Sequence, residues 1–381
     1  MNAPPMTSAA ARPIGMLDLA AEREQIGPEI EAAVLDVLRS GRYVLGPAVE
    51  RFEKSFAALC GVEHGIGVSS GTDALVLALL AVGVRPGDHV VTSPFTFFAS
   101  AGTIAWVGAV PRLADIDPAT GLLDPTAAAA AVDARTTCLL PVHLYGQLAD
   151  VRAFRSLADA RHLSIVEDGA QAHGASRDGA RVGELADAGI LSFYPTKNLG
   201  AAGEAGLVVT RRAEVAARLR ELRDHGMAAK YTHVRLGTNA RMDALQGAVL
   251  GVKLPHLAVW NARRREIAAR YDAAFAGTAV RPLAAAPGSH HVYHQYAVRI
   301  PDEGVRDAVL AGLARAGIQA AVHYPRPVHL QAAAAGWGYG PGDFPAAETL
   351  AAEVLCLPIH PFLADLDADR VAEAVRELAG S

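Results

Sequence analysis

Lysine is scarce in this chain of 381 residues. Only four of its 35 basic residues are lysine, and the other 31 are arginine. Arginine stays charged in proteins, whereas a lysine amine can lose its proton and condense with an aldehyde or ketone. The first residues to inspect for covalent chemistry are therefore Lys54, Lys197, Lys230 and Lys253.

Cysteine is scarcer still, which limits disulfides and metal sites. The three cysteines are odd in number and far apart: Cys60, Cys138 and Cys356. They indicate neither a disulfide framework nor a clustered zinc site. The histidines at 290, 291 and 294 have mixed spacing and no neighbouring cysteine or carboxylate, so we expect no metal there.

Long apolar runs and a charge of one sign are also missing. No run approaches the roughly 18 apolar residues of a membrane span, and residues 1–13 lack the features of a signal peptide. The net charge is −5 and the two signs are interleaved, which is unlike the basic stripe of a nucleic-acid-binding protein. We therefore expect no membrane or nucleic-acid partner, and a cytoplasmic location.

Alternating patterns predict an α/β fold. From about residue 64, short β-branched runs alternate with longer helical runs, which is typical of βα units around a mostly parallel sheet. The predicted strands are His89–Ser93, Cys138–His143, Ser164–Glu167, Ile190–Tyr194 and Leu207–Thr210. The predicted helices are Asp73–Val82, Phe97–Val107, Val151–Arg161 and Glu214–Arg223, with Thr72 and Asp150 as capping residues.

A proline marks the predicted domain boundary. A helical pattern runs from Met242 to Phe275, and the missing amide of Pro255 should kink or break it. The sequence from Tyr293 onward reads as strand, helix, strand, loop and helix. We therefore predict a flexible N-terminus over 1–15, a large domain over 16–254 and a smaller α+β C-terminal domain over 255–381.

The first chemical motif is the sequence GIGVSSGTDAL at 65–75. Small residues that lead into a helix let backbone amides turn toward an anion, so this segment is a candidate phosphate cradle. An ordinary glycine turn is the alternative. A dinucleotide site is disfavoured, because the third glycine falls one place late and no acidic residue ends the next predicted strand.

The second and third motifs each follow a predicted strand. EDGAQAHG at 167–174 puts Asp168 at the carboxyl end of a strand, where ligands bind in open α/β folds. Taken alone, Asp168 would more often be a helix cap or a turn residue. SFYPTKNLG at 192–200 puts Lys197 in a polar loop, where the alternative is a solvated surface charge.

Together the three motifs resemble the DegT/DnrJ/EryC1/StrS family of sugar aminotransferases. That family shows SGTDAL, ED-x-AQ-x-x-G and SF-x-x-x-KN-x-G in this order, and the similarity extends from about residue 40 to residue 362. The resemblance implies a pyridoxal-phosphate-dependent enzyme of fold type I. It further implies a homodimer whose active sites lie at the subunit boundary, L-glutamate as amino donor with glutamine as the alternative, and a keto sugar linked to a nucleotide diphosphate as acceptor.

The resemblance also assigns roles to residues. Lys197 would bind the aldehyde of pyridoxal phosphate and later move the proton, while Asp168 would keep the pyridine nitrogen protonated. The other cofactor contacts would be Gly71, Thr72 and Ser192 at the phosphate, Asn239 of the partner subunit, a stacking Phe97, and Gln171 near the phenolic oxygen. Phe97 could instead be a core residue. The substrate contacts would be Tyr194, His323, Tyr324 and His329, although residues 323–329 could be a mere domain connection.

Finer motifs favour one substrate class. HLYGQ at 143–147, QAHGA at 171–175 and NARMDALQ at 239–246 resemble the branch that aminates carbon 3 of the sugar. Amination at carbon 4 is the alternative. A sugar dehydratase of the same family is less favoured, because such enzymes replace the lysine with histidine, and a regulatory member is less favoured because the set of cofactor residues is complete.

Overall fold

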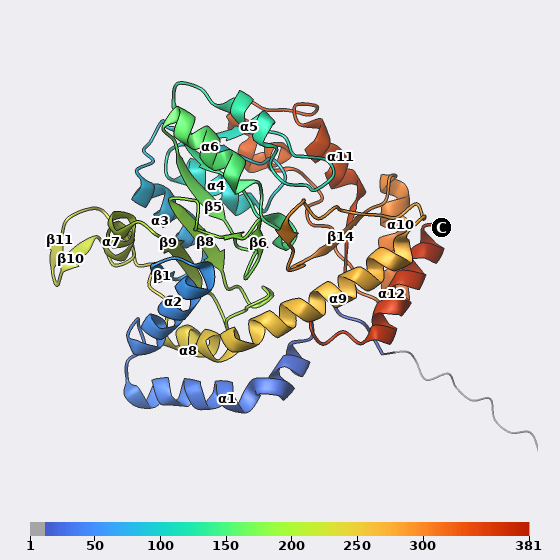
Figure 1. Cartoon of the computed structure of the whole chain (residues 1–381), viewed down its shortest axis with the longest axis horizontal. Coiled ribbons are helices and arrows are strands. Elements are labelled where there is room, and N and C mark those ends of the chain that lie inside the picture. Colours follow the sequence, from blue (N-terminus) through green and yellow to red (C-terminus); the bar gives the residue numbers. More distant parts are fainter. Residues whose placement is uncertain (1–11, 381) are drawn as a thin grey trace, which may run out of the picture.

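A seven-stranded, mostly parallel sheet forms the centre of the protein (Figure 1). The computed structural model describes residues 12–380, and the strand order of this sheet is β1-β9-β8-β5-β4-β2-β3. Only β9 is antiparallel to its neighbours, β1 and β8. The strands are β1 His64–Val68, β2 His89–Thr92, β3 Val110–Leu113, β4 Thr136–Leu140, β5 Ser164–Asp168, β8 Ala188–Ser192 and β9 Gly206–Thr210. The predicted α/β class is confirmed.

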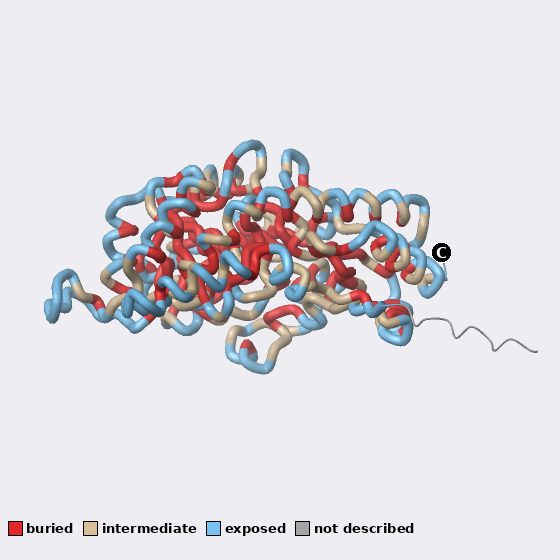
Figure 2. Tube along the Cα trace, turned by 90° about the horizontal axis from the view of Figure 1, so that it is seen from below, coloured by how far each residue is buried: buried red, intermediate tan, exposed pale blue. Residues whose placement is uncertain are grey.

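Helices cover both faces of this sheet (Figure 1). Side chains alternate between the two faces along each strand, so Ile190 of β8 packs in a cluster with Leu75 of α3, whereas Leu191 packs with Phe56 of α2. Figure 2 shows the buried residues gathered along the middle of the molecule. The helices of this region are α1 Leu19–Ser40, α2 Pro47–Cys60, α3 Gly71–Val82, α4 Phe98–Trp106, α5 Pro125–Ala131, α6 Val151–Arg161 and α7 Ala213–Leu222.

The structure confirms all five predicted strands and all four predicted helices, with shifted ends. It corrects the conformation predicted for residues 65–68 and the residue predicted to cap the helix that follows them. Residues 64–68 form β1 and are not a phosphate loop. Gly65 is small because α2 packs against it: a Cβ would lie 2.5 Å from the carbonyl oxygen of Glu53. The cap of α3 is Ser70 instead of Thr72, since Ser70 Oγ accepts a hydrogen bond from Asp73 N at 3.0 Å. The predicted Asp150 cap of α6 is confirmed.

The predicted interruption at Pro255 is also confirmed. α8 Ala244–Lys253 ends in a 3-10 turn, Leu254–His256, from which α9 Leu257–Phe275 continues toward the C-terminal region. There a sheet of order β12-β14-β15 packs with three further helices. These elements are β12 Arg281–Pro282, β14 Tyr296–Arg299, β15 Val354–Leu357, α10 Glu303–Arg315, α11 Pro345–Glu353 and α12 Asp365–Leu378.

Short elements complete the described chain. β6 Ser176–Arg177, β7 Ala180–Arg181 and β13 Ser289–His290 form a small sheet, and β10 Met227–Ala229 with β11 Thr232–His233 forms a hairpin that projects from the body (Figure 1). Three more 3-10 turns are Leu144–Gly146, Val328–Leu330 and Ala332–Trp337. Within residues 12–380, no helix has the length and apolar character needed to cross a membrane.

The N-terminal segment lies against the C-terminal region. Ile14 is buried and forms a parallel bridge with Ile318. The predicted flexible segment 1–15 includes this bridge at its end, so the prediction is wrong at Ile14, where burial and backbone hydrogen bonds hold the chain. Residues 1–11 of that predicted segment lie outside the described residues.

Candidate active site

A cavity of about 660 Å³ opens at the carboxyl ends of β5 and β8. This is the edge at which open α/β sheets bind ligands. Segments far apart in the sequence supply its walls, from the start of α3 to the loop at 323–324. The cavity brings together ten of the predicted site residues: Gly71, Thr72, Phe97, Asp168, Gln171, Ser192, Tyr194, Lys197, His323 and Tyr324.

Asp168 ends β5 with its carboxylate at this cavity. Its Oδ2 accepts a hydrogen bond from Ser100 Oγ at 2.7 Å, and its Oδ1 accepts one from Ala170 N at 3.1 Å. Both donors are neutral, so the negative charge is not cancelled by an ion pair with any residue of the chain between 12 and 380. Asp168 can therefore still accept a hydrogen bond from a cationic group in the cavity.

Lys197 lies on the loop that follows β8, the strand next to β5. Its backbone amide donates to the carbonyl oxygen of Tyr194 at 2.9 Å, which closes the turn after the strand. Burial lowers the pKa of the Lys197 amine to about 8, while the charge of Asp168 opposes this shift. About one amine in ten is therefore uncharged at pH 7, and the uncharged amine is the form that attacks a carbonyl carbon.

The start of α3 has the shape that a phosphate group requires. A Cβ at Gly71 would lie 2.5 Å from Ser192 Cβ, so only glycine lets the end of β8 approach the helix this closely. The first backbone amides of a helix have no partner within the helix, and its amino end carries partial positive charge. Thr72 and Ser192 add hydroxyl groups beside them at the same cavity wall.

The aromatic ring of Phe97 also lines the cavity. Phe97 is 59% exposed, so it is not a core residue. Its ring centroid lies 6.1 Å from that of Tyr324, whose hydroxyl accepts a hydrogen bond from Gln171 Nε2 at 3.3 Å. Gln171 Oε1 in turn accepts from Tyr145 N at 2.6 Å. These contacts hold the Gln171 amide in one orientation beside Asp168 and Lys197.

Two predicted residues lie elsewhere. His329 is buried, and its Nε2 lies 3.1 Å from Glu348 Oε1, so this ring bridges to α11 and does not line the cavity. Asn239 is exposed, and its Oδ1 accepts from Arg241 Nε at 3.0 Å. It also lies outside the cavity of its own chain.

The cavity also contains residues that the sequence did not single out for it. Met16 and Leu17 line it, and no local signal could have revealed a contact with a wall so far along the chain. Glu204 lines it too, in the loop between Lys197 and β9. The sequence offers His294 only as part of a weak metal motif. His294 lines the cavity, and its Nδ1 lies 3.2 Å from Asn198 Oδ1, the residue next to Lys197.

The ring of His173 packs against the loop that carries Lys197. Its ring is buried, stacks on Phe193 and accepts a hydrogen bond from Leu199 N at 3.2 Å. Burial, and then the charge of Lys197, lower the pKa of His173 to about 3, so the ring is neutral. A neutral ring can keep accepting from Leu199, and this fixes the turn that carries Lys197.

The chain is similar to known proteins over nearly its whole length. Residues 24–376 match the sequence profile of the DegT/DnrJ/EryC1/StrS aminotransferase family. A dTDP-3-amino-3,4,6-trideoxy-alpha-D-glucose transaminase from Streptomyces venezuelae is 46% identical over 376 residues, which cover 98% of each chain.

Two solved structures are also similar. One is the crystal structure of DesV from S. venezuelae in complex with a ketimine intermediate, with a TM-score of 0.94, 45% identity, and coverage of 97% of this chain and 100% of that one. The other is ntda from Bacillus subtilis with bound cofactor pmp, with a TM-score of 0.90, 30% identity, and coverage of 98% and 87%.

The fold and the site thus define a pyridoxal-phosphate-dependent aminotransferase. The chain belongs to the DegT/DnrJ/EryC1/StrS family, as the match over residues 24–376 shows. The residues present fit the cofactor: a lysine amine that is partly neutral, a carboxylate that lacks a cationic partner within residues 12–380, and a glycine-dependent helix start lie around one cavity.

Proposed function

We propose that this enzyme transfers an amino group from L-glutamate to carbon 3 of a keto sugar that is linked to dTDP or UDP. The observation that carries the proposal is the shared cavity of Lys197 and Asp168 at neighbouring strand ends, together with a 46% identical relative named as a transaminase of a dTDP-linked 3-amino sugar. The same reaction class would serve amino-sugar biosynthesis.

Pyridoxal phosphate supplies an electron sink that stabilises negative charge on the carbon that loses its proton. Lys197 would hold the cofactor and, once released, move the proton as general base and acid. Asp168 would keep the ring nitrogen charged through an ion pair. Thr72 and Ser192 would bind the phosphate, and Phe97 would stack on the ring, for which its exposed face is available.

Tyr194, His323 and Tyr324 are proposed to contact the substrate, since they line the same cavity as Lys197 and Asp168. The proposal leaves out His329, because its ring is enclosed and bound to Glu348. Burial and the charge of Lys197 lower the pKa of His323, so this ring would meet the substrate in its neutral form.

We also propose that the enzyme works as a homodimer in which Asn239 of one subunit binds the phosphate in the other. The exposed position of Asn239, outside the cavity of its own chain, supports this arrangement. Exposed apolar side chains on the neighbouring projecting segment support it as well: Tyr231, Val234 and Leu236 are 81%, 53% and 96% exposed.

The first experiment tests the amino donor. The purified protein should show a visible absorbance band from bound cofactor, and this band should fall when L-glutamate is added in the absence of any sugar. A protein that retains Lys197 but shows no such band would contradict the enzyme proposal. L-glutamine, added separately, serves as the competing donor.

The second experiment tests the acceptor. Matched 3-keto and 4-keto sugars linked to dTDP or UDP are mixed with the enzyme and L-glutamate, and amino-sugar products are identified by mass and by their position of substitution. We expect turnover of the 3-keto sugars. Preferred turnover of 4-keto sugars would reject amination at carbon 3 and leave the aminotransferase assignment intact.

A further inference from the structure

A buried serine of α4 donates a hydrogen bond to the carboxylate of Asp168. Ser100 Oγ lies 2.7 Å from Asp168 Oδ2, although 68 positions separate the two residues in the sequence. Both side chains are buried. Because an ionised carboxylate can only accept hydrogen bonds, the Ser100 hydroxyl is the donor, and its single hydrogen is committed to Asp168.

A second hydroxyl extends this contact. Thr96 Oγ1 lies 2.9 Å from Ser100 Oγ, and Thr96 is also buried. Since the hydrogen of Ser100 is already used, Thr96 must donate and Ser100 must accept. The two hydroxyls therefore form a chain with one direction, from Thr96 through Ser100 to Asp168. Such chains polarise their members and are stronger in a buried environment than in water.

The position of Ser100 in α4 adds to this effect. Ser100 lies in the first turn of α4, which begins at Phe98. The amino end of a helix carries partial positive charge, which favours a negative charge nearby. The helix end and the hydroxyl chain therefore act in the same sense, and both stabilise the ionised carboxylate of Asp168.

We propose that Ser100 and Thr96 are positioning residues that hold the carboxylate of Asp168 aimed at the ring nitrogen of pyridoxal phosphate. The inference deepens the proposed function and rests on the proposed role of Asp168. Neutral hydroxyls suit this task, because they orient the carboxylate and stabilise its charge without cancelling it. An arginine or lysine in place of Ser100 would compete with the ring nitrogen for Asp168.

Ser100→Ala in the holoenzyme tests the inference. A hydrogen bond to a charged group contributes about 1.5 kcal/mol, so we expect the dissociation constant of the cofactor to rise about tenfold. The visible band of the bound cofactor should titrate at a pH about half a unit higher. The physical reason is that a less positive ring nitrogen lets the nitrogen that joins the cofactor to Lys197 keep its proton to higher pH.

Three further variants give the test its controls. Ser100→Thr keeps the hydroxyl and should restore both values toward those of the unmodified enzyme. Thr96→Val should shift both in the same direction by a smaller amount, about twofold in affinity. Thr103→Val changes a hydroxyl on the same helix that bonds to the carbonyl oxygen of Ala99 at 2.8 Å, and it should leave both values unchanged.

The inference is overturned if Ser100→Ala titrates and binds cofactor like Thr103→Val. If Ser100→Ala proves too unstable to purify, Thr96→Val decides, and an unchanged titration there overturns the inference. Asp168→Asn distinguishes failure of this inference from failure of the proposed role of Asp168. If it changes affinity and titration while the serine and threonine variants do not, only the hydroxyl chain is rejected. If Asp168→Asn changes neither, the proposed role of Asp168 is rejected as well.

Discussion

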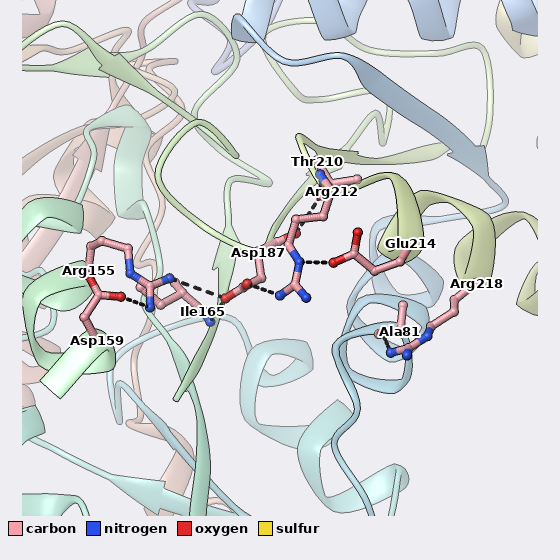
Figure 3. A network of polar contacts seen from close by, with 9 residues as sticks. All are labelled: Ala81, Arg155, Asp159, Ile165, Asp187, Thr210, Arg212, Glu214 and Arg218. Atoms are coloured by element: carbon pink, nitrogen blue, oxygen red, sulfur yellow. Dashed lines mark hydrogen bonds and ion pairs between the residues drawn. The ribbon is translucent and has the colours of Figure 1, made fainter. Parts of the chain in front are cut away.

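The two ends of the central sheet each hold a buried aspartate, but the surroundings of these aspartates differ. Asp187 lies just before β8, at the end of the sheet opposite the cavity, in the network of Figure 3. Its Oδ2 accepts from Ile165 N at 2.8 Å and lies 3.5 Å from Arg155 Nη1, and its Oδ1 accepts from Arg212. Two cations and one amide thus surround this carboxylate.

Asp168 has two neutral donors and no ion pair with any residue from 12 to 380. Because two arginines already neutralise the charge of Asp187, this carboxylate has little capacity to bind a charged ligand. Its contacts instead join α6, β5, β8 and the start of α7. The carboxylate of Asp168, which accepts from a serine hydroxyl and a backbone amide, keeps a charge that can interact with a group in the cavity. Burial alone therefore does not distinguish these two carboxylates, whereas the charge of their partners does.

Among these variants, Lys197→Ala at the cavity should cause the largest loss of turnover. Removal of the amine eliminates both the covalent hold on the cofactor and the proton carrier, so turnover should fall about a thousandfold or more. Cofactor binding should weaken without being lost, because the phosphate and ring contacts remain. Steady-state kinetics and equilibrium dialysis of pyridoxal phosphate measure the two quantities. Measurable turnover close to that of the unmodified enzyme would contradict the assignment of Lys197.

Asp168→Asn should have the next largest effect. The amide keeps the shape of the side chain but cannot pair with a charged ring nitrogen, so kcat should fall about a hundredfold. The unfolding temperature of the cofactor-free protein should stay close to that of the unmodified protein, so that the loss of kcat cannot be attributed to unfolding. Stopped-flow absorbance of the glutamate half-reaction is the measurement, and a rate within twofold of the unmodified enzyme would reject the role.

Asp187→Asn should show the opposite profile. The change leaves Arg155 and Arg212 without their shared carboxylate, and partial exposure of the arginines reduces the cost, so we expect the free energy of unfolding to fall by about 1–2 kcal/mol. Activity per folded molecule should be retained. Chemical denaturation and kcat are measured on the same preparation. A large loss of kcat with unchanged stability would break the contrast between the two aspartates.

The smallest effect is a pH dependence at Lys197. Because burial lowers its pKa to about 8, about one molecule in ten has a neutral amine at pH 7, against about one in three thousand at a pKa of 10.5. The rate of cofactor capture by cofactor-free protein should therefore rise about tenfold between pH 7 and pH 9 and then level off. A rate that still rises tenfold per pH unit at pH 10 would contradict the lowered pKa.

Motifs close in sequence were predicted well. Asp168 is the last residue of β5, and Lys197 lies on the loop that follows β8, so the direction of these two parallel strands places both residues at the same edge of the sheet. The prediction was wrong for Gly65, because small size served the packing of α2 on β1 and not an anion. His329 shares a segment with His323 and Tyr324, yet the 3-10 turn after Pro327 buries its ring toward α11.

Local patterns predicted the alternation of strands and helices, the break at Pro255 and the residues near the strand ends, because these features depend on contacts between residues a few positions apart. The contacts of Ser100 with Asp168, of Met16 with the cavity and of Asp187 with its arginines could be found only in the folded chain. Partners separated by tens or hundreds of positions meet only when the sheet and its helices pack, and no local pattern records that meeting.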